Sequence, residues 1–389
     1  MNIFVIARGY PSNQDPHWGC FEKDQAEALS NMEHKVSILS VDCRFRLYWR
    51  KLGVQTFQNK NISVFNIFVC PNSLLFFLPQ RLKQRFEEWQ LNILYKRASK
   101  LCGIPDILYS HYLTHTKSAV YIQQKYGVPL VGIEHWSALN IRPIPQRILQ
   151  LANESYPYVD HLIAVSNSLK ESILELNINH RSAISVVHNM VGEEFYYNPT
   201  YKNDNTLTFI STGRLVYGKG FDLLINALSQ IQEKLPQKWR LYIVGGGELK
   251  NELQQQINQV RLEQHIHLLG QKNKEEIVQL LQQSDIFILP SRGENFSVAV
   301  LEALACGLPV ISSICGGIRE CIDIHNGLLF PVENTVALAN AIMEMVQNLN
   351  QYNREAIAQD CHARFAPEVI AKQLTTIFEE TIKTHKEQQ

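Results

Sequence analysis

Short apolar segments alternate with longer amphipathic segments along this chain, and the whole alternation occurs twice. Segments of strand length lie in the first half at residues 2–6, 35–39, 62–68, 107–109, 130–133, 161–165 and 184–187. A second series lies at residues 207–211, 240–244, 267–269, 286–289, 309–312 and 328–330. Helical stretches fill most intervals, as in residues 80–100, where Leu82, Phe86, Trp89 and Ile93 recur at helical spacing. Strands alternating with helices favour doubly wound α/β folding, and two series predict two such domains.

A polar stretch at residues 196–204 separates the two series and is the best candidate for a linker. We therefore expect an N-terminal Rossmann-like domain at residues 1–195 and a C-terminal one at residues 205–365. The total length of 389 residues is sufficient for two domains of ordinary size. Ligands of doubly wound sheets bind beside the carboxyl ends of the strands, so the two domains are expected to face a central cleft.

Charge is balanced over the chain but not along it, with 37 basic and 37 acidic residues in total. Residues 1–200 carry 20 basic and 16 acidic side chains, whereas residues 201–389 carry 17 and 21. Most of the basic excess lies at residues 44–100, where 11 basic residues face 2 acidic ones. The basic residues cluster locally and no nucleic-acid motif accompanies them, so a nucleic-acid partner is not expected.

The cysteines and the N-terminal residues indicate in which cellular compartment the protein is expected. The eight cysteines are scattered and form no Cys-x-x-Cys, which predicts reduced thiols in a cytoplasmic protein. The start, MNIFVIARGYP, has no small-residue cleavage site and is expected to form the first strand instead of a signal peptide. The apolar stretch at residues 62–79 is interrupted by Asn66, Pro71 and Asn72, so a membrane span is not expected there.

Two carboxylates, Glu294 and Glu302, stand eight positions apart in an otherwise apolar segment, SRGENFSVAVLEALACGLPV. Glu302 falls within an expected buried helix that Gly307 and Pro309 terminate. A carboxylate on such a helix needs hydrogen-bond donors or stays protonated, and sugar hydroxyls are suitable donors. The alternative is a structural ion pair or a carboxylate that faces solvent.

Glycine-rich loops follow several strands of the second series. The first, STGRLVYGKG, carries Arg214 and Lys219. A guanidinium can donate two parallel hydrogen bonds and an ammonium is a compact positive charge, so the two together suit a diphosphate. The alternative for this loop is a solvated surface turn. Glycines 245–247 let a ligand or a neighbouring backbone approach, but they do not form the Gly-x-Gly-x-x-Gly fingerprint of a dinucleotide site. The pair Gly316 and Gly317 follows a later strand.

In the first half, two residues at strand-to-loop junctions are candidates for a site. Gly19 lies in the long loop between the first strand and its helix. His135 directly follows the fifth strand, beside Glu134 and Trp136. A histidine in a fold is often structural, but one at the carboxyl end of a strand is better placed to meet a ligand.

Together these residues resemble a family 4 glycosyltransferase of the GT-B fold. The resemblance covers almost the whole second half and, more diffusely, the first, where IEHWS, AVS and VHN are similar to family landmarks. It implies that Arg214 and Lys219 hold the donor diphosphate, that Glu294 binds the donor sugar and that Glu302 binds the ribose. It further implies sugar or phosphate contacts for Gly19, His135, Gly246, Phe296, Ser297, Val298, Gly316 and Gly317. The C-terminal helix, about residues 366–389, is expected to pack back onto the first domain.

The resemblance also implies a retaining, metal-independent transfer from a nucleoside-diphosphate sugar, with no cofactor. The chain contains no Asp-x-Asp, which fits a site that uses arginine and lysine in place of a metal ion. Two departures from the family pattern affect the surroundings of the sugar and phosphate, so they leave the donor open. Asn295-Phe296-Ser297 stands where Gly-Phe-Gly is frequent, and Gly19-Cys20 stands where two glycines are frequent.

The acceptor is expected to be a glycan or a lipid-linked glycan, bound by the first half, in surface polysaccharide or oligosaccharide biosynthesis. Residues 44–51, RFRLYWRK, interleave cations with aromatic side chains, and Arg81, Lys83 and Arg85 follow. We expect this basic 44–100 region to dock on an anionic membrane surface, which would make the protein cytoplasmic and peripheral on the inner face. A solvated basic face is the alternative. Rival functions are a non-catalytic sugar-nucleotide-binding subunit and a nucleotide-sugar epimerase on the same fold.

Overall fold

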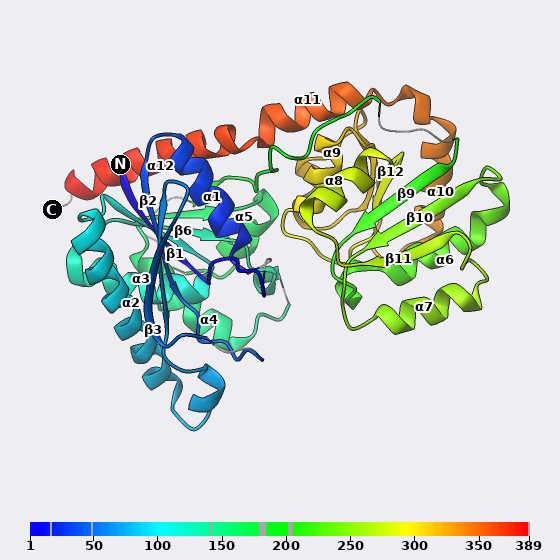
Figure 1. Cartoon of the computed structure of the whole chain (residues 1–389). Helices are drawn as coiled ribbons and strands as arrows, with labels where there is room; N and C mark the ends of the chain where they lie inside the picture. Colours follow the sequence, from blue (N-terminus) through cyan, green and yellow to red (C-terminus); the bar gives the residue numbers. More distant parts are fainter. Residues whose placement is uncertain (16–17, 48–49, 141, 179–183, 201–204, 388–389) are drawn as a thin grey trace. The chain divides into compact units, whose positions relative to one another are not determined.

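The computed structural model describes residues 1–15, 18–47, 50–140, 142–178, 184–200 and 205–387 (Figure 1). The chain forms two compact units. Unit 1 comprises Met1–His188 and Pro367–Gln389, and unit 2 comprises Asn189–Ala366. Each unit is a doubly wound α/β domain, as predicted.

The boundary between the units lies earlier than the expected linker. Two residues assigned to the linker already contact unit 2: the side-chain amide of Gln282 donates to the carbonyl of Tyr196 (2.9 Å), and the guanidinium of Arg354 lies 5.6 Å from the ring centroid of Tyr197. The polar composition indicated an irregular segment correctly, but composition does not reveal which unit such a segment packs on. Residues 201–204 of the expected linker lie outside the described residues.

Unit 1 is built on an eight-stranded sheet with the order β3-β4-β2-β1-β5-β6-β7-β8. The strands are β1 (Asn2–Ala7), β2 (Lys35–Val41), β3 (Gly53–Asn59), β4 (Ile62–Phe68), β5 (Ile107–His111), β6 (Leu130–Glu134), β7 (His161–Ala164) and β8 (Ile184–Val186). Pairing is parallel except between β3 and β4. The chain runs from β1 to one side and returns to pair β5 on the other, so the strand order reverses between β1 and β5. Such a reversal is where α/β sheets bind ligands.

Helices cover both faces of this sheet. They are α1 (Cys20–Asn31), α2 (Gln80–Cys102), α3 (Leu113–Tyr126), α4 (Gln146–Asn153), α5 (Asn167–Leu174) and α12 (Pro367–Glu387), with short 3-10 turns η1 (Asn72–Leu75), η2 (Ser137–Asn140) and η3 (Tyr156–Tyr158). Helix α12 packs with α1 on one face, and α2 packs with α3 on the other (Figure 1).

The return of α12 to unit 1 confirms the expectation for residues 366–389. The ring of Phe378 packs edge-on against Tyr109 (centroids 4.9 Å apart), and His385 pairs with Asp160 (3.2 Å). Both Phe378 and Tyr109 are fully buried, so the helix forms part of the core of unit 1.

Two sequence-based expectations for unit 1 were wrong. Strand β3 was missed, because its outer position in the sheet leaves much of it exposed and its sequence, GVQTFQN, has little apolar alternation. The apolar stripe expected for residues 80–100 is not the buried face of α2: Leu82 and Trp89 are about half exposed, whereas Leu91 and Leu94 are buried.

Unit 2 is built on a parallel six-stranded sheet with the order β11-β10-β9-β12-β13-β14. The strands are β9 (Leu207–Thr212), β10 (Trp239–Val244), β11 (Ile266–Gly270), β12 (Ile286–Leu289), β13 (Val310–Ser313) and β14 (Gly327–Phe330). The helices are α6 (Phe221–Ile231), α7 (Lys250–Gln259), α8 (Lys274–Gln282), α9 (Val298–Ala305), α10 (Thr335–Gln347) and α11 (Arg354–Phe365), and the 3-10 turns are η4 (Tyr217–Lys219), η5 (Gln232–Lys234), η6 (Gly316–Glu320) and η7 (Leu349–Gln351). Strand order reverses between β9 and β12, so the loops after these two strands flank the expected ligand position (Figure 1).

Candidate functional site

The loops after β9 and β12 bring Lys219 and Glu294 together in unit 2. The ammonium of Lys219 lies 2.5 Å from the Oε1 atom of Glu294. The hydroxyl of Ser291 donates to the same carboxylate oxygen (2.7 Å). The Lys219 side chain is 25% exposed and that of Glu294 is 11% exposed, so a ligand can reach the pair although it is mostly enclosed. Two residues that stand 75 positions apart in the chain therefore form one charged site.

Glycines at these loops permit the close approach that forms the pair. Gly220 has a φ of +66°, and a Cβ atom there would lie 2.0 Å from the carbonyl oxygen of Pro290, at the end of β12. Gly316 has a φ of +52°, and a Cβ atom there would lie 1.6 Å from the carbonyl oxygen of Glu294. The amide of Gly317 donates to the carbonyl of Asn295 (2.9 Å). Side chains at Gly220 or Gly316 would force the loops apart, so these glycines fix the geometry of the site.

Arg214 lies on the loop after β9, and its side chain is exposed. The glycines at 245–247 support this loop through the backbone. A Cβ atom at Gly245 would lie 1.8 Å from the carbonyl oxygen of Gly213, and the amide of Leu215 donates to the carbonyl of Gly246 (3.0 Å). Of the two roles left open for Gly245, the approach of a neighbouring backbone is therefore the one that the structure shows.

Helix α9 begins with Ser297 at the N-cap and Val298 as its first residue. Phe296 and Ser297 are buried, and the side-chain amide of Asn189 donates to the carbonyl of Phe296 (3.0 Å). Glu302 is half-buried on the same helix. The first amides of α9 have no side-chain cap, so they remain available to an anionic or hydroxylic ligand.

Arg292 holds the loops of this site together, and it was not singled out from the sequence. Its guanidinium binds the carboxylate of Asp222 through two contacts (2.8 and 2.7 Å), contacts Glu333 (2.5 Å) and lies 3.9 Å from the ring centroid of Tyr217. The hydrogen bond with Asp222 raises the pKa of Arg292 further above its ordinary value. Arg292 precedes the Glu294 loop by two positions, and its own amide donates to the carbonyl of Gly218 (2.8 Å), so it ties that loop to the Lys219 loop.

In unit 1, His135 follows β6 and is held by the residue before it. The buried carboxylate of Glu134 accepts four hydrogen bonds, from the amides of Leu113 (2.8 Å), His135 (2.9 Å) and Trp136 (2.8 Å) and from the hydroxyl of Tyr156 (3.2 Å). Burial raises the pKa of Glu134 to about 7, although these donors oppose the rise. The carboxylate thus fixes the turn that presents His135. In the sequence, only the position of Glu134 next to His135 indicated this role.

His111, at the end of β5, backs His135 from inside the fold. The two imidazole rings are parallel, with centroids 5.4 Å apart, and His111 is fully buried. Neither ring nitrogen of His111 has a hydrogen-bond partner within the described parts of the chain. Burial lowers the pKa of His111 well below its ordinary value, so the ring is neutral at physiological pH and does not repel a protonated His135.

Arg8, directly after β1, was not singled out from the sequence. Its Nε and Nη2 atoms contact the fully buried carboxylate of Glu22 on α1 (2.8 and 3.3 Å), and its guanidinium lies 3.7 Å from the ring centroid of Tyr112. Burial opposes ionisation of Glu22, but the bond to Arg8 lowers the pKa of that carboxyl below its ordinary value. A half-buried cation is thereby held at the carboxyl edge of the sheet. In the sequence, the position of Arg8 directly after a strand was the feature that could have indicated a site residue.

Gly19 is required by the backbone of this loop. It caps α1 with a φ of +80°, and a Cβ atom there would lie 2.3 Å from the carbonyl oxygen of Gly9. The loop after β1 therefore folds back on itself at Gly19. A phosphate contact for Gly19 stays a prediction.

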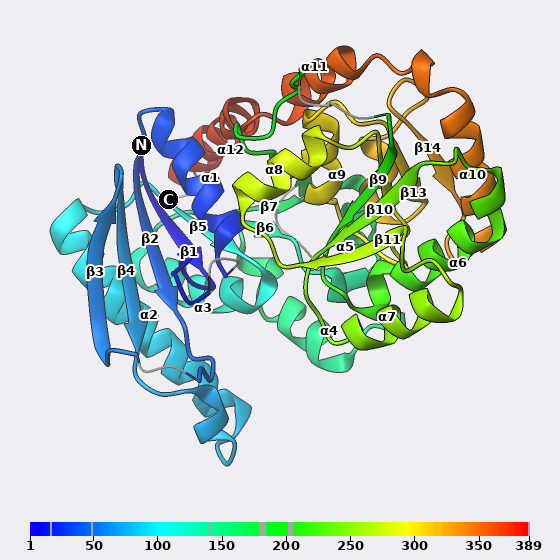
Figure 2. The ribbon, with the colours of Figure 1, turned by 45° about the vertical axis from the view of Figure 1, so that its right-hand side comes forward.

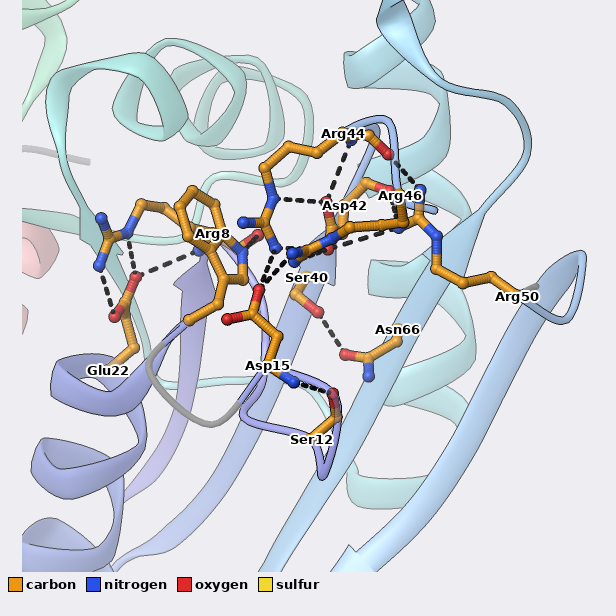
Figure 3. Close-up of polar contacts among 11 residues, drawn as sticks. Arg8, Ser12, Asp15, Glu22, Ser40, Asp42, Arg44, Arg46, Arg50 and Asn66 are labelled. Carbon is orange, nitrogen blue, oxygen red and sulfur yellow. Dashed lines mark hydrogen bonds and ion pairs between the residues drawn. The ribbon is translucent and has the colours of Figure 1, made fainter. Parts of the chain in front are cut away.

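The arginines at residues 44–50 differ from the freely solvated basic face that was one sequence-based alternative (Figure 3). Arg44 makes a two-point contact with Asp42 (3.0 and 2.9 Å), and Arg50 lies 3.4 Å from the same carboxylate. Arg46 pairs with Asp15 and also contacts Asp42. These cations serve internal ion pairs, so they contribute little to an anionic docking surface. Tyr48 and Trp49 lie outside the described residues.

Acidification is expected to destabilise unit 1 through His115, on the first turn of α3. Burial lowers the pKa of His115 from 6.5 to about 4, and Arg8 acts in the same direction, whereas Glu22 and Asp42 oppose it. Between these values the unfolded chain binds a proton that the folded chain rejects, so stability falls as the pH drops from 6.5 to 4. The loss reaches about 2 to 3 kcal/mol.

Denaturant unfolding of wild type and of His115→Gln at pH 7 and pH 4 measures this contribution by difference. The difference cancels the opposite effect of Glu134, whose raised pKa lowers stability as the pH rises from 4.5 to about 7. Wild type should lose about 2 to 3 kcal/mol more than the variant on acidification. An equal loss in both proteins would contradict the assignment to His115.

Comparison with known proteins agrees with this arrangement. A model described as "Glycosyltransferase Family 4" matches residues 23–195, and one described as "Glycosyl transferases group 1" matches residues 193–359. An uncharacterized glycosyltransferase of Methanocaldococcus jannaschii is 28% identical over 245 residues, which are 62% of this chain and 66% of that protein, slightly less than two thirds of its length. The putative teichuronic acid biosynthesis glycosyltransferase TuaC of Bacillus subtilis is 26% identical over 363 residues, 88% of both chains.

Solved structures show the same fold across the whole chain. Sucrose-phosphate synthase from Thermosynechococcus elongatus has a TM-score of 0.80 at 17% identity, covering 99% of this chain and all of that one. Anabaena HepE, solved with UDP, has a TM-score of 0.72 at 18% identity, covering 98% of this chain and all of that one. The two doubly wound domains thus have the GT-B fold. The chain belongs to glycosyltransferase family 4.

Proposed function

We propose that this protein is a retaining glycosyltransferase that moves a sugar from a nucleoside diphosphate to a glycan or lipid-linked acceptor. The observation that carries the proposal is the contact between Lys219 and Glu294 where strand order reverses in unit 2. A cation for a leaving diphosphate and a carboxylate for sugar hydroxyls are the two groups that such a transfer needs side by side. Surface polysaccharide or oligosaccharide biosynthesis is the setting we infer, and the printed name of TuaC supports it.

The donor is assigned to unit 2. Arg214 and Lys219 would bind the diphosphate and offset the charge that develops as it leaves. Glu294 would bind hydroxyls of the donor sugar, with amides at the start of α9 beside it. Glu302, one helix turn further along α9, would bind the ribose. Binding of UDP by HepE supports a nucleotide donor of this kind.

No metal ion is assigned a role, because the two cationic side chains supply the positive charge that a divalent ion would supply. Lys219 contacts Glu294, so a cation lies where the diphosphate is expected. His135, held by Glu134 and backed by His111, would contact the donor sugar near the reacting carbon. The departing phosphate would act as the base, so no nucleophilic carboxylate is required.

We further propose that unit 1 docks on an anionic membrane through an exposed apolar segment. Phe76 is 81% exposed, Phe77 68% and Leu74 60%, and the segment from η1 to the start of α2 projects from the rest of unit 1 (Figure 2). Arg81 and Arg85 follow within the first turns of α2 and are exposed. Aromatic side chains next to arginines suit the headgroup region of an anionic bilayer.

This membrane contact is peripheral. Within the described residues, no helix is both long enough and apolar enough to cross a bilayer. The docking segment is the later part of the basic 44–100 region that the sequence indicated, because the arginines at residues 44–50 are internally paired whereas Arg81 and Arg85 remain at the surface. We propose the cytoplasmic face of the membrane as the location, where a lipid-linked acceptor and a nucleotide sugar would both be present.

Donor binding tests the proposed function directly. Purified protein is screened for thermal stabilisation by UDP-, GDP- and ADP-sugars, with EDTA and without added metal. We expect one donor class to raise the unfolding temperature equally in both conditions. Stabilisation that EDTA abolishes would contradict metal independence. Stabilisation without turnover, even with varied acceptors, would instead support the non-catalytic sugar-nucleotide-binding subunit.

Replacing Glu302 with alanine is expected to raise the donor KM about tenfold and to leave kcat within about threefold of wild type. Ribose contacts change little during the reaction, so their loss weakens the ground state and the transition state equally. Initial rates at varied donor concentration measure both constants. A fall in kcat without a change in KM would contradict the ribose assignment.

A further inference from the structure

A pocket of about 400 Å³ lies within unit 1, at the carboxyl ends of β1 and β2. Its lining includes Arg8, Trp18, Asp42 and Arg44 from the loops after these strands, and His115 and Ser118 from α3. The volume falls within the range of small-molecule sites. Neither Lys219 nor Glu294 belongs to it, because both lie in unit 2. Every residue that lines the pocket belongs to unit 1.

The arginines around the pocket do not make it an anion site. Each faces a carboxylate: Arg8 pairs with Glu22, Arg44 with Asp42, Arg46 with Asp15, and Arg50 with Asp42 (Figure 3). Glu87 adds another carboxylate to the lining. Positive charge is thus offset locally, so a phosphate or carboxylate ligand would gain little electrostatic attraction.

The pocket nevertheless has hydrogen-bond donors and acceptors for a ligand. Arg8 and Arg44 use their Nε and Nη2 atoms in the contacts with Glu22 and Asp42, and Nη1 takes no part in those contacts. The Nδ1 atom of His115 meets the hydroxyl of Thr114 (2.9 Å), which leaves Nε2 on the other side of a neutral ring. The pocket therefore offers donors and acceptors without a net charge.

Apolar surface completes the lining. Trp18 is fixed by a hydrogen bond from its Nε1 atom to the carbonyl of Arg8 (3.0 Å) and by the guanidinium of Arg44, 3.1 Å from its ring centroid. Phe45 and Leu91 also line the pocket. Because the Arg44 guanidinium lies over the Trp18 ring, Phe45 and Leu91 supply the apolar wall for the C–H face of a pyranose ring, and the fixed polar groups suit its hydroxyls.

We propose that this pocket binds one uncharged sugar residue of the acceptor. Paired charges, a neutral imidazole and apolar walls recognise a neutral polyol and discriminate against an anionic sugar or a phosphate. The proposal deepens the proposed function by giving the chemical class of the acceptor residue, and it rests on that function only in calling the bound sugar an acceptor.

Saturation-transfer NMR on the full chain tests the pocket. The probes are the methyl glycosides of glucose, galactose, mannose and N-acetylglucosamine, against methyl glucuronide and inorganic phosphate. We expect at least one neutral glycoside to bind at millimolar concentration. Arg44→Gln should weaken that binding about tenfold, because it removes a charged hydrogen-bond donor. Arg97→Gln is the matched control, since Arg97 is an exposed arginine of the same unit, bonded to Thr56, and should bind like wild type.

Ser118→Leu should abolish glycoside binding by filling the pocket. Should that variant fail to fold, Ser73→Trp blocks the exposed rim without disturbing the core. Preferred binding of phosphate or glucuronide, or glycoside binding unchanged in Arg44→Gln and in a folded blocking variant, would overturn the proposal. Absence of binding by every neutral glycoside would also overturn it. Donor stabilisation, measured separately through unit 2, reports on the proposed function independently.

Discussion

Replacing Lys219 with alanine is expected to lower kcat by about 100- to 1000-fold. Lys219 would stabilise charge on the departing diphosphate, which is greatest in the transition state, so the loss should fall mainly on kcat. Initial rates at saturating donor measure it. A variant that keeps its kcat and changes only the donor KM would contradict the assigned role, because that pattern reports lost ground-state binding.

Two comparisons separate this effect from a loss of folding. Lys272→Ala removes a lysine of the same unit that pairs with Glu276 on the surface (2.8 Å), and it should behave as wild type. Thermal unfolding of Lys219→Ala shows whether unit 2 tolerates Glu294 without its counter-ion. The contrast with Glu302→Ala, expected to act on KM, tests the two assignments against each other.

Removing the exposed phenylalanines, as Phe76→Ser together with Phe77→Ser, is expected to lower partitioning onto anionic vesicles by about 100-fold. Both side chains are largely exposed, so burying them in the headgroup region recovers much of the free energy that apolar burial supplies. Sedimentation with phosphatidylglycerol-containing vesicles measures the partitioning. Retention of wild-type binding by the double variant would contradict docking through this segment.

The control for the vesicle experiment comes from unit 2. Ile324 is 81% exposed, as Phe76 is, so Ile324→Ser removes one comparably exposed apolar side chain outside the proposed docking segment and should leave partitioning unchanged. Arg81→Gln should weaken binding less, by about 1 kcal/mol, and only at low salt, because surface charges are screened. A failure of wild type to bind anionic vesicles at low salt would end the docking proposal.

The strands were predictable because they are nearly continuous apolar runs, buried between two layers of helices. All the predicted strands are present, with ends shifted by at most a few residues. Strand β3 was not predictable in this way, since an outer strand that is largely exposed lacks that signal. The inward face of α2 was also missed, because Leu82 and Trp89 mimic a buried stripe while remaining half exposed.

The site was partly predictable. Lys219 and Glu294 were identified from loop glycines and from a carboxylate in an apolar segment, and the structure places them in contact. Arg292 and His111 carried no such signal, and Arg8 only its position after a strand, because their roles depend on contacts with other elements, such as Glu22 for Arg8 and Asp222 for Arg292. Periodicity reports burial along one element, whereas these contacts join different elements.

Because α12 belongs to the core of unit 1, the chain enters unit 2 at Asn189 and leaves it at Ala366 as an insertion within unit 1. During synthesis on the ribosome, all residues of unit 2 are therefore made before unit 1 has its last helix. Until α12 has been synthesised, Tyr109 lacks its contact with Phe378, and α1 lacks its contact with α12. Synthesis of unit 1 therefore starts before that of unit 2 but ends after it. In most multidomain chains the N-terminal domain is complete, and can fold, first.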